Sequence, residues 1–269
     1  MDLEAEYNNR ARVPEHPAHI AAWARDSAAW RAECPRAELN LAYGTEPRQA
    51  LDLFWPDAGE DAPIAVWIHG GYWQGLDRST SSHCARGLNL RGVAVAVPSY
   101  TLCPQNTVVG ILAEMRAAMG FLHARHGRPL LVMGHSAGGH LAAMLAATDW
   151  SQFGLPGLLV PSILPVSGVF ELEPLLTTSI ATALHLDAEM AHALSPRFLP
   201  SPHIECHAVV GGAESSEFLR QTREFAAAWH GSWEAIPGAD HFTVTAPFSN
   251  PAHPLVARAA GMAEALAAS

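Results

Sequence analysis

The chain has 269 residues, of which 49% are hydrophobic and 16% charged, so it can fill a sizeable core and is not a mainly disordered protein. Lys and Arg number 16 and Asp and Glu 26, which gives a formal net charge of −10. This balance argues against a nucleic-acid-binding protein and against one held on membranes by a basic surface. It does not exclude an anionic substrate, because one local Arg can hold a carboxylate.

Cysteine usage and the lack of targeting signals predict a cytoplasmic protein with no membrane partner. No Cys-x-x-Cys pair occurs, and four widely spaced cysteines predict free thiols in a reducing compartment rather than a disulfide framework. Residues 2–6 are mostly acidic, unlike the basic start of a signal peptide. The longest apolar stretch, Leu155–Phe170, is interrupted by three prolines and is too short to span a bilayer. The oligomeric state is left open, with a homodimer as one alternative.

The chain is predicted to begin with an N-terminal arm over about residues 1–45 that packs on the core. Scattered prolines and one helical stretch, Ala18–Ala32, characterise this segment. Beyond it, apolar runs of strand length alternate with helical segments. The runs lack polar alternation, as is typical of parallel strands buried on both faces: Ile64–Ile68, Val93–Val97, Leu130–Met133 and Ile204–Val210. Helices are predicted over Thr107–His126, Ala137–Ala147, Glu217–Trp229 and Val256–Ala268.

These repeated units predict an α/β fold with a mostly parallel central sheet and helices on both faces. Residues 170–202 depart from the alternation, because they combine short helical stretches with several prolines. We interpret them as a small cap-like insertion over the carboxyl ends of the strands, where ligands bind in open α/β sheets. A surface excursion without substrate contact is the alternative. Arm, sheet and insertion are expected to form a single domain over residues 1–269.

The string GHSAGG at residues 134–139 contains Gly-x-Ser-x-Gly between a predicted strand and a predicted helix. This pattern places the serine on a sharp turn, and glycines two positions away on either side remove side chains that would clash there. Because both flanks fit, Ser136 is predicted to be the nucleophile of an α/β-hydrolase fold. The dipole of the following helix adds positive potential near its hydroxyl.

The string HGGYW at residues 69–73 follows the first of these strands. Backbone N–H groups of such a glycine-rich loop can converge on a carbonyl oxygen that gains negative charge during nucleophilic attack. The predicted oxyanion donors are therefore the N–H groups of Gly70, Gly71 and Ala137, and which glycine dominates is left open. The side chains predicted to contact the substrate are Tyr72, Trp73, His135 and Phe170.

A serine needs a general base at neutral pH, and the chain order in this fold is Ser, acid, His. His241 is predicted to be the base because it lies on a loop after a short predicted strand, Trp233–Ile236. The competitors are less suited: His230 ends a helix, and His253 lies beyond the expected catalytic loop.

The predicted acid is Glu214, the first carboxylate in the loop after the strand that ends near residue 210. Its role would be to orient the imidazole and to stabilise the imidazolium that forms. Glu217 is an alternative, although a carboxylate that begins a helix is favourable for the helix dipole alone. Asp187 and Asp240 are the remaining candidates.

Fifteen histidines make metal binding worth considering. The closest spacings are His123 with His126 and His203 with His207, but no His-Glu-x-x-His or other clustered ligand pattern accompanies them. We therefore predict no metal and no organic cofactor, and a small-molecule substrate.

The two strings, read as HGGYW at 69–73 and GHSAGGHL at 134–141, together resemble the kynurenine formamidase (arylformamidase) branch of the α/β-hydrolases. The Tyr-Trp pair is more specific than the serine motif, which many hydrolases share. The resemblance extends over nearly the whole chain through residues 7–10, 43–53, 167–175 and 214–218.

This resemblance implies hydrolysis of N-formyl-L-kynurenine to formate and L-kynurenine in tryptophan breakdown. It implies Ser136 as nucleophile and His241 as base. The family acid is usually Asp, whereas the matching residue here is Glu214. The expected activity is removal of a formyl or small acyl group from an aryl amide or ester. A broad short-chain carboxylesterase is the first alternative. A non-catalytic binding protein of the same fold is the second, and the intact set of three residues argues against it.

Overall fold

The computed structural model describes residues 1–267, whose strands form one eight-stranded sheet in the order β1-β2-β4-β3-β5-β6-β7-β8. β2 runs antiparallel to both of its neighbours, and all pairs from β4 to β8 are parallel. This topology confirms the predicted, mostly parallel sheet of an α/β-hydrolase. The strands are β1 (Ala37–Ala42), β2 (Ala50–Phe54), β3 (Ile64–Ile68), β4 (Ala94–Pro98), β5 (Leu130–His135), β6 (Ser162–Val166), β7 (Glu205–Gly211) and β8 (Ser232–Ile236).

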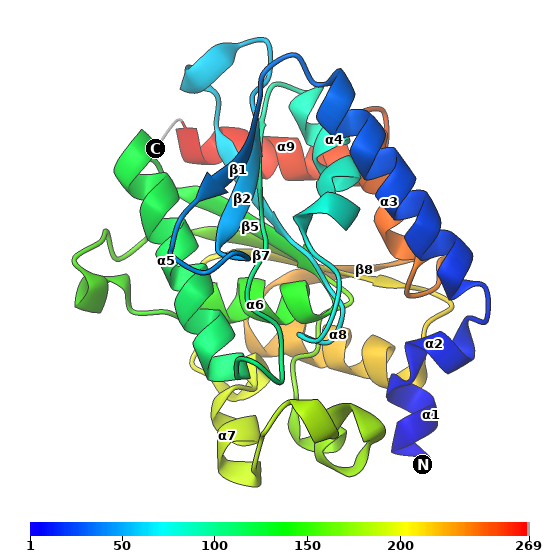
Figure 1. Ribbon diagram of the computed structural model, residues 1–269. Coiled ribbons are helices and arrows are strands. Elements are labelled where there is room, and N and C mark those ends of the chain that lie inside the picture. Colours follow the sequence, from blue (N-terminus) through cyan, green and yellow to red (C-terminus); the bar gives the residue numbers. More distant parts are fainter. Residues whose placement is uncertain (268–269) are drawn as a thin grey trace.

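Helices cover both faces of the sheet (Figure 1). Residues of α5, α6 and α8 pack on one face, and residues of α3, α4 and α9 pack on the other. Thr107 caps the start of α5 and Gly127, at φ +65°, ends it, as the sequence predicts. The α-helices are α1 (Leu3–Tyr7), α2 (Asn9–Arg12), α3 (His16–Glu33), α4 (Arg86–Asn89), α5 (Val108–His126), α6 (Ala137–Ala146), α7 (Ala188–Ala193), α8 (Ser216–Ala228) and α9 (Pro254–Ala267). None of the helices in residues 1–267 has the length and apolar character needed to cross a membrane.

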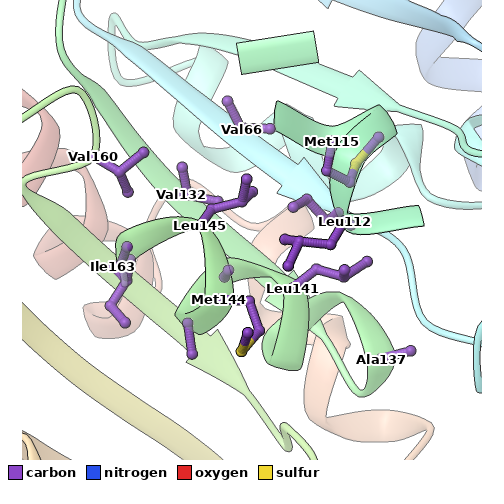
Figure 2. Close-up of a cluster of buried hydrophobic side chains, with 14 of the residues drawn as sticks. Val66, Leu112, Met115, Val132, Ala137, Leu141, Met144, Leu145, Val160 and Ile163 are labelled. Carbon is purple, nitrogen blue, oxygen red and sulfur yellow. The ribbon is translucent and has the colours of Figure 1, made fainter. Parts of the chain in front are cut away.

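The core around α6 consists of aliphatic and methionine side chains, most of them from α5, α6 and three strands (Figure 2). Every residue of α6 is buried, because this helix lies between the sheet and α5. Val66 and Val132 face this side, whereas the next residues along their strands, Trp67 and Met133, pack on the opposite face. These continuous apolar strands therefore bury side chains on both faces of the sheet.

One carboxylate lies inside this apolar sheet. Asp52, in the middle of β2, has no exposed surface. Its Oδ2 lies 2.9 Å from Nε of Arg31 in α3, and its Oδ1 lies 3.4 Å from Nε of Arg78 and accepts the N–H of Asn40. Burial of a charge costs free energy unless the charge is paired, so these contacts hold α3 and β1 against β2.

The first helix is anchored to the start of α8, more than 200 residues away in the sequence. The Tyr7 hydroxyl donates to Oε2 of Glu217 over 2.8 Å and accepts a hydrogen bond from Nε2 of Gln221 over 2.6 Å. Glu6 accepts hydrogen bonds from the Ser216 hydroxyl and from the backbone N–H of Glu217. The predicted arm is thus helical up to residue 33, and its last part is the edge strand β1.

Candidate active site

Ser136 occupies the junction between β5 and α6, at φ +56° and ψ −117°. A positive φ is uncommon for a residue with a side chain, and the surrounding turn must impose it. The turn is tight because nearby positions lack side chains: a Cβ on Gly134 would come within 2.5 Å of Gly138, and one on Gly138 within 2.0 Å of the Ile68 carbonyl oxygen. The Ser136 N–H donates to the Val166 carbonyl, which fixes the turn to β6. The local geometry is that of the predicted strained turn.

Glu214 and His241 form a hydrogen-bonded pair, with 2.7 Å between Oε2 and Nδ1. The other oxygen of the carboxylate, Oε1, accepts hydrogen bonds from the Ser167 hydroxyl and from the Gly211 N–H. The Glu214 side chain is fully shielded from solvent. Both oxygens therefore have donors, which holds the carboxylate in one orientation towards the imidazole.

The imidazole of His241 lies between two other rings. Its centroid is 4.7 Å from that of Phe218 at the start of α8 and 4.6 Å from that of His135. His135 is buried, and burial together with the nearby His241 holds its pKa well below the usual range. His135 therefore stays neutral beside His241.

Ser136 and His241 face one cavity of about 410 Å³, which falls within the usual size range of small-molecule sites. No hydrogen bond joins the Ser136 hydroxyl to His241 in the described part of the chain; such contacts often tighten only when substrate is bound. His135, Gly71 and Tyr72 line the same cavity.

The alternative acids have other partners. Glu217 pairs with Arg220, Asp240 accepts the backbone N–H groups of residues 242 and 243, and Asp187 caps α7. None of these side chains lines the cavity, and neither do the two alternative bases, His230 and His253.

The glycine-rich loop passes directly beside the nucleophile. A Cβ on Gly70 would lie 2.9 Å from the His135 carbonyl oxygen and 3.1 Å from Cβ of Ser136. Gly71 has φ +100°, and a side chain there would meet the Gly75 carbonyl oxygen at 2.3 Å. Within residues 1–267, the N–H groups of Gly70, Gly71 and Ala137 have no protein acceptor. Unused donors beside a nucleophile are suited to hold an oxyanion.

The aromatic residues predicted to contact substrate are placed differently from one another. Tyr72 lines the cavity, and its hydroxyl donates to the Tyr7 carbonyl over 2.7 Å. Trp73 and Phe170 have no exposed surface and belong to the core beneath α5 and α6. Neither contributes to the cavity wall, so their substrate-binding role has no support from this geometry.

A large part of the cavity wall comes from two segments: the insertion, which is predicted to lie over the strand ends, and the arm, which the sequence did not mark as part of a site. The insertion contributes Ser179 and Ile180, and Ser179 donates two hydrogen bonds to Glu4 of α1, so insertion and arm meet over the strand ends. For the arm, the only sequence signal is that residues 7–10 take part in the family resemblance. The wall residues from the arm and from the loop after His241 are Tyr7, Asn8, Asn9, Arg10, Ile20, Trp23 and Phe242.

In the part of the chain that the structure describes, no three His, Cys, Asp or Glu side chains come together as metal ligands would. All four cysteines are buried and free of disulfide bonds, as predicted.

Known proteins with similar sequences show to which family the chain belongs. A family model described as BD-FAE matches residues 51–156. The kynurenine formamidase of Salmo salar is 32% identical over 221 residues, which cover 77% of this chain and 75% of the relative. The chain belongs to the kynurenine formamidase family. Within this family, the enzyme of Danio rerio is 31% identical over 220 residues, which again cover 77% of this chain and 75% of the relative.

Solved structures agree with the hydrolase fold of this member of the kynurenine formamidase family. A crystal structure from Silicibacter sp. TM1040, provisionally assigned as a thioesterase, has a TM-score of 0.88 and 34% identity over 96% of this chain and 98% of that one. Esterase B of Lactobacillus rhamnosis has a TM-score of 0.72 at 21% identity, over 98% of this chain and 96% of that one, which bears on the fold alone. The predicted family resemblance and the predicted hydrolase class are confirmed.

Proposed function

We propose that this protein is a serine hydrolase that cleaves N-formyl-L-kynurenine into formate and L-kynurenine. The observation that carries the proposal is that His241, hydrogen-bonded to Glu214, lines the same cavity as Ser136, in a chain of the kynurenine formamidase family. Ser136 serves as nucleophile, His241 as base and Glu214 as the group that orients His241.

The first half of the reaction transfers the formyl group to the enzyme. His241 takes the proton of the Ser136 hydroxyl as its oxygen attacks the formyl carbon. The N–H groups of Gly70, Gly71 and Ala137 donate to the resulting oxyanion. The carboxylate of Glu214 stabilises the imidazolium. His241 then gives its proton to the aryl nitrogen, the C–N bond breaks, and the arylamine leaves.

The second half releases formate. A water molecule attacks the formyl ester on Ser136 while His241 accepts one of its protons. The tetrahedral intermediate collapses, the Ser136 oxygen takes the proton back from His241, and formic acid leaves and ionises. The net change is addition of one water across the C–N bond.

The cavity wall suits an aryl leaving group. Trp23, Tyr72 and Phe242 line it beside the serine, and Trp23 and Phe242 stack on each other with 5.8 Å between centroids. An aromatic substrate ring packed against these faces gains about 0.5–1.5 kcal/mol beyond its burial.

The decisive measurement compares kcat/KM for N-formyl-L-kynurenine with that for phenyl acetate and 4-nitrophenyl butyrate. We expect the formamide to be the better substrate by at least tenfold. A preference for the esters would instead support the short-chain carboxylesterase, which would use the same three residues. Labelling of Ser136 by an organophosphate separates both enzymes from a non-catalytic binding protein. A cytoplasmic location and a homodimer stay predictions.

A further inference from the structure

The charge of the cavity wall differs from that of the whole chain. Arg10 is the one Lys or Arg among the described residues that line the cavity, and no Asp or Glu lines it. The chain as a whole has a formal charge of −10. The cavity is therefore a locally cationic site on an acidic protein, and such a site attracts an anionic ligand.

The guanidinium of Arg10 is exposed and has no hydrogen bond or ion pair within residues 1–267. Three arginines elsewhere in the chain are engaged instead: Arg31 and Arg78 with Asp52, and Arg220 with three glutamates. A free, planar guanidinium at a cavity is suited to bidentate binding of a carboxylate.

The backbone that carries Arg10 is held firmly against the site. The side chain of Asn8 caps α2 by accepting the Ala11 N–H, and it also donates to Glu4. Asn9 donates to the Tyr72 hydroxyl over 3.4 Å, which links α2 to the oxyanion loop. Arg10 thus projects from an anchored helix while its own donors stay unused, so only its side chain has to be ordered when it binds a ligand.

We propose that Arg10 determines specificity by binding a carboxylate on the leaving-group part of the substrate. This inference rests on the proposed function and extends it: the preferred substrates are aryl formamides or aryl esters with a carboxylate on a short side chain. Arg10 takes no part in bond breaking. Its contribution is to substrate binding, and therefore to KM more than to kcat.

The first test compares two formamides. N-formyl-L-kynurenine has the carboxylate, whereas N-formyl-2-aminoacetophenone keeps the aryl ketone and lacks the amino-acid group. We expect Arg10→Ala to raise KM for the former by about ten- to a hundredfold and to change KM for the latter less than twofold. Arg10→Lys should lie between, because it keeps the charge without the planar fork.

The matched control is Arg25→Ala. Arg25 lies on α3, is largely exposed, and pairs only with the adjacent Asp26. This variant removes the same charge from the arm without touching the cavity, so both substrates should keep their parent KM. Circular dichroism and thermal unfolding confirm that each variant is folded, and Arg10→Gln replaces Arg10→Ala if the latter is not.

A second substrate pair makes the test independent of formamidase activity. It consists of 3-(4-acetoxyphenyl)propanoate and its methyl ester, which differ in the carboxylate alone. If the protein hydrolyses esters but not N-formyl-L-kynurenine, the proposed function fails, whereas a selective effect of Arg10→Ala on the acid still supports carboxylate binding. Equal effects on acid and methyl ester, or no effect on either, would overturn the assignment of Arg10.

Discussion

The hydroxyl of Ser167 donates a hydrogen bond to Oε1 of Glu214, the oxygen that His241 does not use. Ser167 follows β6 at φ +48°, and its N–H donates to the Val209 carbonyl, so its position is set by the junction of two central strands. The longer glutamate side chain, at a position where the family usually has aspartate, is thereby fixed by groups outside the predicted triad.

Replacing Ser167 should weaken catalysis without removing it. We expect Ser167→Ala to lower kcat about tenfold with little change in KM, because Glu214 retains the Gly211 N–H but loses one donor. Ser162→Ala is the control, since Ser162 begins the strand that Ser167 follows and contacts Glu205 instead. Steady-state kinetics on both variants provide the test, and an unchanged kcat for Ser167→Ala would show that this hydroxyl does not position the acid.

Removal of the nucleophile should abolish turnover. We expect Ser136→Ala to lower kcat/KM by about 10⁴-fold or more, as loss of a triad member does in other serine hydrolases. Substrate binding should persist, because the cavity wall is unchanged, and fluorescence titration can measure it. A variant with a tenth of the parent activity would rule out Ser136 as nucleophile.

The two neighbouring glutamates should respond differently to amidation. Glu214→Gln should lower kcat by about 10³- to 10⁴-fold, because the amide cannot stabilise the imidazolium. Glu217→Gln should lower the melting temperature, because Glu217 accepts a hydrogen bond from the Tyr7 hydroxyl and forms an ion pair with Arg220. Kinetics and calorimetry on the same preparations separate the two roles, and the opposite result would assign the acid to Glu217.

Trp73 should matter for stability rather than for selectivity. Its side chain is fully buried and meets the His140 ring edge-on with 5.0 Å between centroids. We expect Trp73→Ala to lower the free energy of unfolding by about 3–5 kcal/mol, as large-to-small changes in cores do. Relative kcat/KM values along a series of aryl esters from acetate to octanoate should stay as in the parent. A changed chain-length preference would show that Trp73 contacts the acyl group after all.

Buried histidines should make the protein acid-sensitive. Burial lowers the pKa of His69, His83 and His140 to about 4, from an ordinary value near 6.5. Between these two pH values the three histidines bind protons in the unfolded chain but not in the folded chain. The free energy of unfolding therefore falls as the pH drops from 6.5 towards 4. At pH 5 each site accounts for roughly 2 kcal/mol. Urea unfolding at pH 7.5 and pH 5 should show this loss of unfolding free energy. His83→Gln should make the loss smaller by the contribution of one histidine. An equal loss in parent and variant would contradict this origin.

The sequence predicts those strands whose apolar runs are continuous, and it fails where a local feature hides the pattern. β2 has Asp52 at its centre, and β6 contains Pro165, although both strands are fully buried. In β2 the carboxylate is tolerated because arginines from distant segments neutralise it. No local pattern could show that compensation.

The candidate site, like the fold, is predictable from the sequence only in part. Ser136 and the glycine loop are recognisable because a few consecutive residues determine their geometry, and His241 and Glu214 follow from the chain order of the fold. Arg10 and Trp23 reach the cavity only through long-range docking of the arm. The burial of Trp73 likewise depends on packing against α6, so the sequence could not distinguish a core residue from a substrate contact.

The docking of Tyr7 on Glu217 has a consequence for the order in which the protein folds during translation. Tyr7 is synthesised 210 residues before its anchor Glu217 on α8. Until then the α1 and α2 helices lack this anchor, and helices of four or five residues do not persist alone in water. The cavity wall that they supply is therefore completed only after most of the sheet has been translated. A nascent chain released before α8 would lack this anchor and also His241, which follows α8 in the sequence.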